Sequence, residues 1–78
     1  MQFLPEIRRI MCSVMAVAPD SIGPHTQPND LPAWDSLSHL NLVVAMEDEL
    51  GIRLSAAEIE RMTSVSAICA IVAGKRGA

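Results

Sequence analysis

The chain has 78 residues, a length that fits one small domain with a modest core and leaves little room for the deep pocket of an enzyme. Half of the residues are hydrophobic but only 3% are aromatic, so the core must consist of Leu, Ile, Val, Met and Ala, a composition that favours helices. The formal net charge of -3 argues against nucleic acid as a partner.

The first third of the chain predicts one helix followed by a long loop. Apolar residues spaced by three and four predict an amphipathic helix over residues 3–16, with Pro5 in its first turn, where a missing N–H costs nothing. Residues 18–33 are rich in proline and polar residues, which exclude a long regular element. We expect an ordered crossover, with Trp34 packed where it meets the next helix.

The stretch from residue 34 to residue 51 predicts the second helix. Asp35 is a favourable N-cap residue, and Gly51 is a usual terminator just past a helix end. Ser36 should therefore lie in the first turn, beside backbone N–H groups without helical partners and at the positive end of the dipole. Such a position favours a bound phosphate.

Two further helices are predicted after a short connector. The residues from Ser55 to Glu58 match a capping box, which predicts a short helix over residues 56–61. Thr63 or Ser64 can cap a last helix, and residues 74–78 are expected to form a flexible basic tail. No alternating pattern is long enough for a sheet.

The predicted fold is therefore a single all-α domain over residues 1–78, a small four-helix bundle with a long first loop and a short third helix. The apolar stretches are interrupted before the roughly 18 residues that a membrane-spanning helix needs, and no basic leader with a cleavage site precedes them. We expect a cytoplasmic monomer that associates neither with a membrane nor with nucleic acid.

A helical wheel divides the apolar residues of the second helix into two arcs. The first is the expected core stripe and consists of His39, Leu42, Val43, Met46 and Leu50. The second consists of Leu37, Leu40 and Val44, flanked by Asn41, Glu47 and Asp48.

Two interpretations of this second arc remain open. It packs against the loop or the third helix, or it docks a partner. Between residues 35 and 60, six acids (Asp35, Glu47, Asp48, Glu49, Glu58 and Glu60) stand against one base, Arg53. A partner of this surface should therefore be basic, although a run of charges is also typical of a solvated helix face.

No catalytic or metal-binding constellation is predicted. Asp35 supplies the helix cap, which leaves the Ser36 hydroxyl free, but no G-x-S-x-G elbow surrounds it. His39 lies on the core arc, and His25 is expected to be solvated in the loop. The cysteines, Cys12 and Cys69, lie in apolar runs without metal-ligand spacing, so buried free thiols are predicted.

At this point the motif and its setting resemble a known family. Asp35-Ser36-Leu37 follows a proline-rich loop and opens an acidic helix that ends Ala45-Met46-Glu47-Asp48-Glu49-Leu50-Gly51-Ile52. This arrangement resembles the acyl carrier protein family over nearly the whole chain. The resemblance implies that a phosphopantetheinyl transferase attaches 4′-phosphopantetheine from coenzyme A to Ser36, with Asp35 and Leu37 as motif neighbours. It also implies a non-catalytic carrier that holds acyl groups as thioesters on this arm.

The resemblance further implies basic partner enzymes: an acyl-loading ligase or acyltransferase, and a ketosynthase or another acyl-processing enzyme. The docking residues that it indicates are Leu37, Leu40, Asn41, Val44, Glu47 and Asp48.

The subclass is indicated by the residues around the motif. Trp34 stands where a glycine-alanine type of lead-in is usual, and the W-D-S-L-x-H-L form resembles stand-alone or modular carriers of secondary metabolism. The implied pathway is fatty-acid-like, polyketide or related. The alternatives are a carrier-fold interaction module without the prosthetic group and an aminoacyl or peptidyl carrier, whose G-G-x-S motif fits less well.

Overall fold

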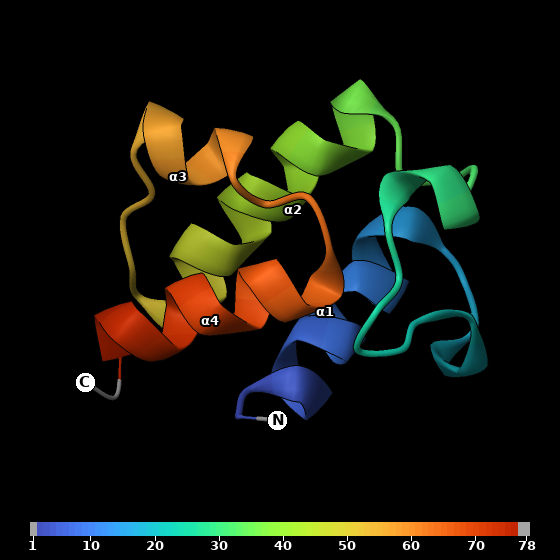
Figure 1. Ribbon diagram of the computed structural model, residues 1–78, viewed down its shortest axis with the longest axis horizontal. Helices are drawn as coiled ribbons and strands as arrows, with labels where there is room; N and C mark the ends of the chain where they lie inside the picture. The colour runs from blue at the N-terminus through green and yellow to red at the C-terminus, as the bar shows by residue number, and fades with distance from the viewer. Residues whose placement is uncertain (1, 77–78) are drawn as a thin grey trace.

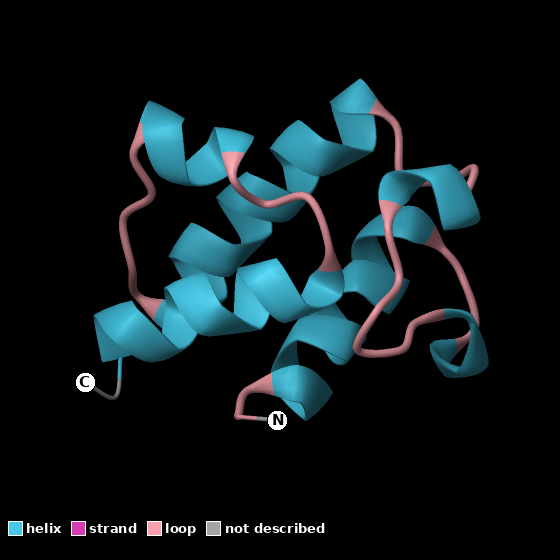
Figure 2. Cartoon of the chain, in the orientation of Figure 1, coloured by secondary structure: helices cyan, strands magenta, loops and turns pink. Residues whose placement is uncertain are grey.

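A computed structural model describes residues 2–76 as a bundle of helices (Figure 1). Two single 3-10 turns, η1 (Pro19–Ser21) and η2 (Pro28–Asp30), lie in the long loop. Helices account for all the regular structure of residues 2–76 (Figure 2), which confirms the predicted all-α fold. The four α-helices are α1 (Leu4–Met15), α2 (Ser36–Leu50), α3 (Ala56–Glu60) and α4 (Val65–Arg76).

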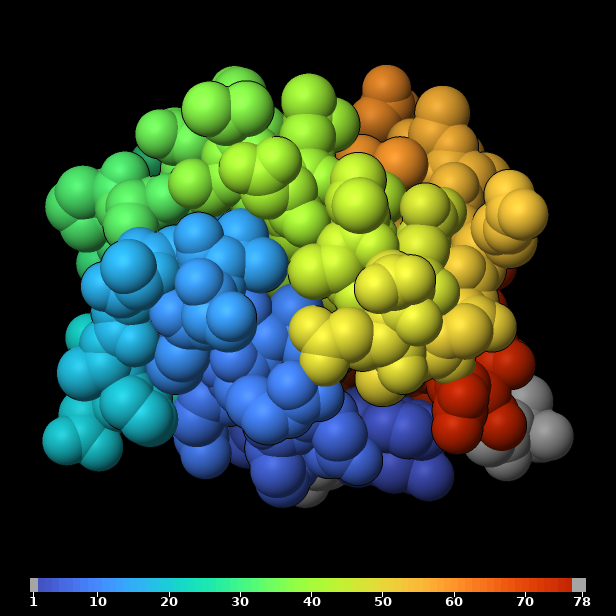
Figure 3. All heavy atoms as spheres, turned by 180° about the vertical axis from the view of Figure 1, so that it is seen from behind, coloured from blue at the N-terminus to red at the C-terminus, as the bar shows by residue number. Residues whose placement is uncertain are grey.

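Helix α1 packs against both α2 and α4. It lies alongside α2 on the back of the molecule, where α1 is blue and α2 runs from green to yellow (Figure 3). Its proline lies in the first turn as predicted. The apolar stripe of α1 is buried as its spacing predicts, through Ile7, Ile10, Met11 and Met15.

The long loop is ordered, as predicted, because both polar and apolar contacts hold it. The Arg8 guanidinium on α1 donates to the Ile22 carbonyl at 2.9 Å, and the Val65 N–H at the start of α4 donates to the Thr26 carbonyl at 2.9 Å. Three apolar side chains of the loop and its end are buried in the core: Ile22, Leu31 and Trp34. The loop therefore brings Trp34 to a fixed position at the start of α2.

Both ends of α2 lie where the sequence predicts them. The Asp35 carboxylate accepts a hydrogen bond from the Ser38 N–H at 2.8 Å, which satisfies one of the free donors of the first turn. Gly51 ends the helix in the left-handed region, with φ of 65°. The predicted core stripe of α2 is buried through Leu42, Val43, Met46 and Leu50.

Side-chain caps are also present at the N-termini of the last two helices. Ser55 and Glu58 exchange the two hydrogen bonds of the predicted capping box at α3, and α3 ends one residue before the predicted end. The Ser64 hydroxyl accepts from the Ala67 N–H at 3.1 Å, so Ser64 caps α4.

Helix α4 continues further than predicted. Residues 74–76 are helical. The Lys75 ammonium forms an ion pair with Glu58 at 2.9 Å, and the Arg76 guanidinium donates to the Leu50 carbonyl at 2.6 Å. The prediction of a flexible tail is therefore wrong for residues 74–76, because these basic side chains find partners on α3 and α2. Residues 77 and 78 of that predicted tail lie outside the described residues.

The two cysteines differ in burial. Cys69 is buried in the core as predicted, and burial raises the pKa of its thiol. Cys12 is only half-buried, and both cysteines are free. Among residues 2–76, none of the helices has the length and apolarity needed to cross a membrane.

Candidate functional site

Ser36 is the first residue of α2 and is exposed. Its neighbour Asp35 caps the helix, so the serine hydroxyl is not needed for that purpose. Within residues 2–76, no hydrogen bond uses Ser36 Oγ. The first turn of a helix carries partial positive charge from its N–H groups. Ser36 therefore presents a free hydroxyl at a position that stabilises an attached phosphate.

The capping carboxylate is ionised at neutral pH. The hydrogen bond from the Ser38 backbone N–H is the main cause that lowers the pKa of Asp35 below its ordinary value of 3.8. The Asp35 carbonyl also accepts from the His39 N–H at 2.8 Å. Asp35 thus holds the first turn of α2 through two hydrogen bonds.

An open groove with a volume of about 730 Å³ lies beside Ser36. The sequence indicated one of its walls, α2, but not the opposite walls, which come from η2 and α3. Those residues reach the site only through tertiary packing, and no local pattern in the sequence signals it. The walls include Pro28 and Asn29 of η2, Ser36 and Leu40 of α2, and Ile59 and Thr63 on either side of the end of α3.

A chain of hydrogen bonds connects three residues that line this groove. The Trp34 indole N–H donates to His39 Nδ1 at 2.9 Å, and His39 Nε2 lies 3.2 Å from the Ile59 carbonyl on α3. The two rings are nearly parallel, at 20°, with centroids 6.0 Å apart. His39 was predicted to face the core; it is half-buried and connects α2 to α3.

The protonation state of His39 follows from its partners. An indole N–H can only donate, so His39 Nδ1 must accept and cannot carry a proton. The proton of the neutral ring therefore lies on Nε2, which donates to the Ile59 carbonyl. Because both ring nitrogens are engaged, His39 does not serve as a base for Ser36.

The second apolar arc of α2 is exposed. The exposed fractions are 69% for Leu37, 56% for Leu40 and 64% for Val44. The interpretation that this arc packs against the loop or α3 is therefore wrong for these three side chains. We call them the α2 strip; with Ser36 at one end, they form an apolar surface that a partner can reach.

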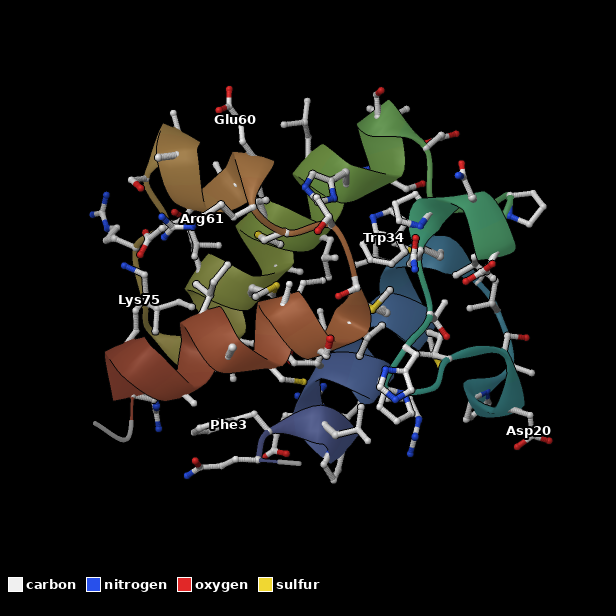
Figure 4. All side chains as sticks on the ribbon, viewed as in Figure 1. Phe3, Asp20, Trp34, Glu60, Arg61 and Lys75 are labelled. Atoms are coloured by element: carbon white, nitrogen blue, oxygen red, sulfur yellow. The ribbon has the colours of Figure 1, made fainter. Side chains whose placement is uncertain are left out.

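The polar residues predicted beside the strip are not equivalent. Asn41 and Asp48 are exposed. Glu47 is half-buried, and its carboxylate accepts from the Leu54 N–H at 2.9 Å, so one of its oxygens holds the connector after α2. Glu60, which is not among the predicted docking residues, lines the groove and points outward from α3 (Figure 4).

Comparisons with known proteins agree with this geometry. The family described as "Phosphopantetheine attachment site" matches residues 5–72. The acyl carrier protein of Campylobacter hominis is 29% identical over 65 residues, 83% of this chain and 82% of that protein. The acyl carrier protein of Streptomyces coelicolor is 33% identical over 73 residues, 92% of this chain and 79% of that protein.

A solved structure is similar over nearly the whole fold. The solution NMR structure of a holo acyl carrier protein from Geobacter metallireducens has a TM-score of 0.87 and 31% sequence identity to this chain. The match covers 96% of this chain and 86% of that one. The chain therefore belongs to the acyl carrier protein family, whose prosthetic group is phosphopantetheine.

Proposed function

We propose that this chain carries acyl groups on a 4′-phosphopantetheine arm attached to Ser36. The observation that carries the proposal is the exposed Ser36 hydroxyl, which forms no hydrogen bond within residues 2–76 because Asp35 caps the helix. The helix N-terminus stabilises a phosphate at this position. The adjoining groove of about 730 Å³ leaves room for a chain-like group, so the residues present fit the prosthetic group.

The attachment step needs only the serine from this chain. A bond forms between Ser36 Oγ and the phosphorus next to the pantetheine of coenzyme A. The bond from that phosphorus to the adenosine-bearing phosphate breaks, and the hydroxyl proton passes to a base of the phosphopantetheinyl transferase. When bound, the group supplies a terminal thiol that holds an acyl group as a thioester.

The chain acts as a carrier, and its partners supply the catalysis. His39, the histidine in the groove, has both ring nitrogens engaged with Trp34 and Ile59, so it does not activate Ser36. An interaction module without the prosthetic group would not need a free, exposed serine beside an open groove. The cargo that we propose is an acyl group of a fatty-acid-like, polyketide or related specialised pathway; an aminoacyl or peptidyl cargo is the alternative.

Partner enzymes dock on the α2 strip in this proposal. Its three apolar side chains are more than half exposed, and the carboxylates of Asp48 and Glu60 lie near it on exposed positions. Such a surface suits basic partners: the transferase, a loading ligase or acyltransferase, and a ketosynthase. Charges of this kind raise the rate of encounter more than they tighten the complex, which suits a carrier that must dissociate.

Mass spectrometry tests the attachment. After incubation with coenzyme A and a promiscuous phosphopantetheinyl transferase, the intact wild-type protein should gain the mass of one phosphopantetheine. Ser36→Ala should gain nothing, whereas Ser38→Ala, a matched serine in the same turn, should gain the wild-type mass. No gain in the wild type would contradict the carrier function, and a gain that survives Ser36→Ala would contradict the site.

Two charge-reversal variants test whether partners dock on the α2 strip. Asp48→Lys should lower the association rate constant with a basic partner severalfold and weaken its dependence on salt. Asp20→Lys makes the same change of charge on η1, away from α2 and α3 (Figure 4), and should change these rates little. Stopped-flow binding measures both. Equal effects of the two variants would show that net charge, and not the α2 strip, governs the encounter.

A further inference from the structure

We propose that the groove beside Ser36 discriminates among acyl groups by their charge. An uncharged or cationic acyl group lies against the walls of the groove, whereas an acyl group that ends in a carboxylate stays in solvent. Glu60 on α3 is the residue that sets this preference, together with Asp35 at the start of α2. The inference names the class of cargo for the proposed function and rests on attachment of the arm at Ser36.

A group attached to Ser36 reaches the groove without leaving the molecule, because Ser36 itself lines it. A short flexible tether gives an effective concentration in the millimolar range. The volume of about 730 Å³ lies within the range of roughly 300 to 1,000 Å³ that accommodates drug-sized ligands. A weak attraction or repulsion by the walls therefore decides whether a tethered acyl group lies in the groove.

The walls offer apolar surface to such a group. Leu40 on α2 is 56% exposed, and Ile59, on the opposite wall, is half-buried. The buried side chains of Trp34 and Met62 also line the groove. Methylene groups of a cargo gain by covering the exposed part of this surface. A carboxylate gains nothing from it and must give up water to approach.

The charges of the groove have one sign. Among residues 2–76, its carboxylates are Asp35 and Glu60, and no lysine or arginine lines it. Both ring nitrogens of His39 are engaged by Trp34 and Ile59, so His39 offers no positive charge to a cargo. A carboxylate in the groove therefore meets only charges of its own sign, whereas an ammonium group meets opposite ones.

The charge of Glu60 is not neutralised by its surroundings. Glu60 is exposed, and it takes no part in the two ion pairs found within residues 2–76. Arg61, the next residue, does not line the groove. Figure 4 shows Arg61 on the side of α3 that faces Lys75, while Glu60 points outward. Glu60 is therefore free to act on a group held in the groove.

Three short acyl groups that differ in charge test the proposal. A promiscuous transferase attaches malonyl, malonamyl and β-alanyl arms to Ser36 from their coenzyme A thioesters. The rate of thioester cleavage by neutral hydroxylamine is divided by the rate for the same acyl group on free pantetheine, which cancels intrinsic reactivity. On the protein, malonamyl and β-alanyl should be cleaved about twofold to fivefold more slowly than when free. Malonyl should be cleaved at the free rate.

Backbone amide NMR of the same samples shows where the cargo lies. Relative to the protein with an unacylated arm, malonamyl should shift the amides of Ile59 and Thr63, which line the groove. Malonyl should leave these two amides unchanged.

Two variants test the role of Glu60. Glu60→Gln removes the carboxylate at nearly constant shape and should slow cleavage of the protein-bound malonyl thioester up to about threefold at low salt. Asp48→Asn removes an exposed carboxylate that does not line the groove and should leave the rate unchanged. If Glu60→Gln does not fold, the wild type still decides. Salt screens the repulsion and should slow cleavage of malonyl but not of malonamyl.

Four results would overturn the proposal. They are no protection of any cargo, equal protection of malonyl and malonamyl, equal effects of the two variants, and malonyl cleavage that does not depend on salt. A wild type that accepts no arm at all would overturn the proposed function, and this inference with it. A loaded wild type without discrimination would overturn the inference alone and leave the carrier function standing.

Discussion

The two ends of α2 differ in how accessible they are. At its C-terminal end, polar side chains fasten the helix to its surroundings: Glu47 accepts from the Leu54 N–H, Arg9 pairs with Glu49 at 2.8 Å, and Arg76 donates to the Leu50 carbonyl. At its N-terminal end, Asp35 and His39 also make hydrogen bonds, but the first residue, Ser36, is exposed and opens onto the groove.

The C-terminal end of α2 is therefore its anchored end, and the N-terminal end is its accessible end. The guanidinium at the C-terminal end satisfies a free carbonyl and complements the negative end of the dipole. The positive end remains open for an attached phosphate, and the α2 strip beside it remains open for partners. Variants at the two ends should therefore affect stability and carrier function separately.

The largest expected effect comes from the buried side of α2. Leu42 is fully buried, whereas Leu40, two residues earlier, is 56% exposed. Leu42→Ala should lower the free energy of unfolding by about 3 kcal/mol, because it leaves a cavity. Leu40→Ala should change it by less than about 0.5 kcal/mol, yet slow partner docking. Urea denaturation measures the pair, and similar losses would show that the strip belongs to the core.

Variants of the neighbouring acids Glu47 and Asp48 should have different effects, one on stability and the other on docking. Glu47→Ala leaves the Leu54 N–H without its acceptor and should cost about 1 kcal/mol of stability. Asp48→Ala, at the next and exposed position, should cost less than about 0.5 kcal/mol and act mainly on partner association. Thermal denaturation measures the stability of both variants, and stopped-flow binding measures their association with a partner. A Glu47→Ala protein as stable as the wild type would mean that the connector does not depend on this hydrogen bond.

The terminator of α2 should matter for stability but not for function. Gly51 has φ of 65°, and no atom of another part of the chain lies within 4 Å of the position that a Cβ would occupy there. Gly51→Ala should therefore cost about 1 kcal/mol through backbone strain alone. The reverse change, Ala16→Gly, relieves a left-handed alanine with φ of 55° and should stabilise by a similar amount. Both variants should be phosphopantetheinylated at the wild-type rate, since Ala16 caps the end of α1 and Gly51 the end of α2. Slower modification of Gly51→Ala would contradict the independence of the two ends of α2.

The smallest expected effect is a change in acid sensitivity. The hydrogen bond from the Ser55 N–H, with Lys75, lowers the pKa of Glu58 below its ordinary value of 4.5. Its contribution to stability is therefore present above about 4.5 and is lost as the pH falls through the folded-state pKa. Between pH 7 and pH 3, the Tm of Glu58→Gln should fall less than that of the wild type. Asp48→Asn is the control, and an equal fall for Glu58→Gln and the wild type would contradict the role of this carboxylate.

Local signals in the sequence predicted the helices well. Asp35, Gly51 and the Ser55–Glu58 box each act within a few residues, so residue type and spacing were enough to locate the ends of α2 and the start of α3. The division of α2 into a buried and an exposed arc followed from helical periodicity. The position of Ser36 in the first turn followed from these same signals.

Features that depend on distant partners were missed. The helical conformation of residues 74–76 involves Glu58 and Leu50, and the latter lies 26 residues before Arg76. Three other features also arise from packing between segments. They are the hydrogen bond from the Leu54 N–H to Glu47, the groove wall formed by η2, and the contacts of His39 with Trp34 and Ile59. A pattern within one helix specifies which face is buried, but not which polar group meets it.

The contrast between the two ends of α2 is tested most directly by comparing the backbone amide NMR spectra of the unmodified and phosphopantetheinylated protein. The largest shift changes should fall at Ser36, Leu37 and His39 and at the groove wall around Ile59. Amides at the anchored end, Leu50 and Leu54, should change little. Changes centred on the anchored end, or spread evenly along α2, would contradict the assignment of attachment and access to its N-terminal end.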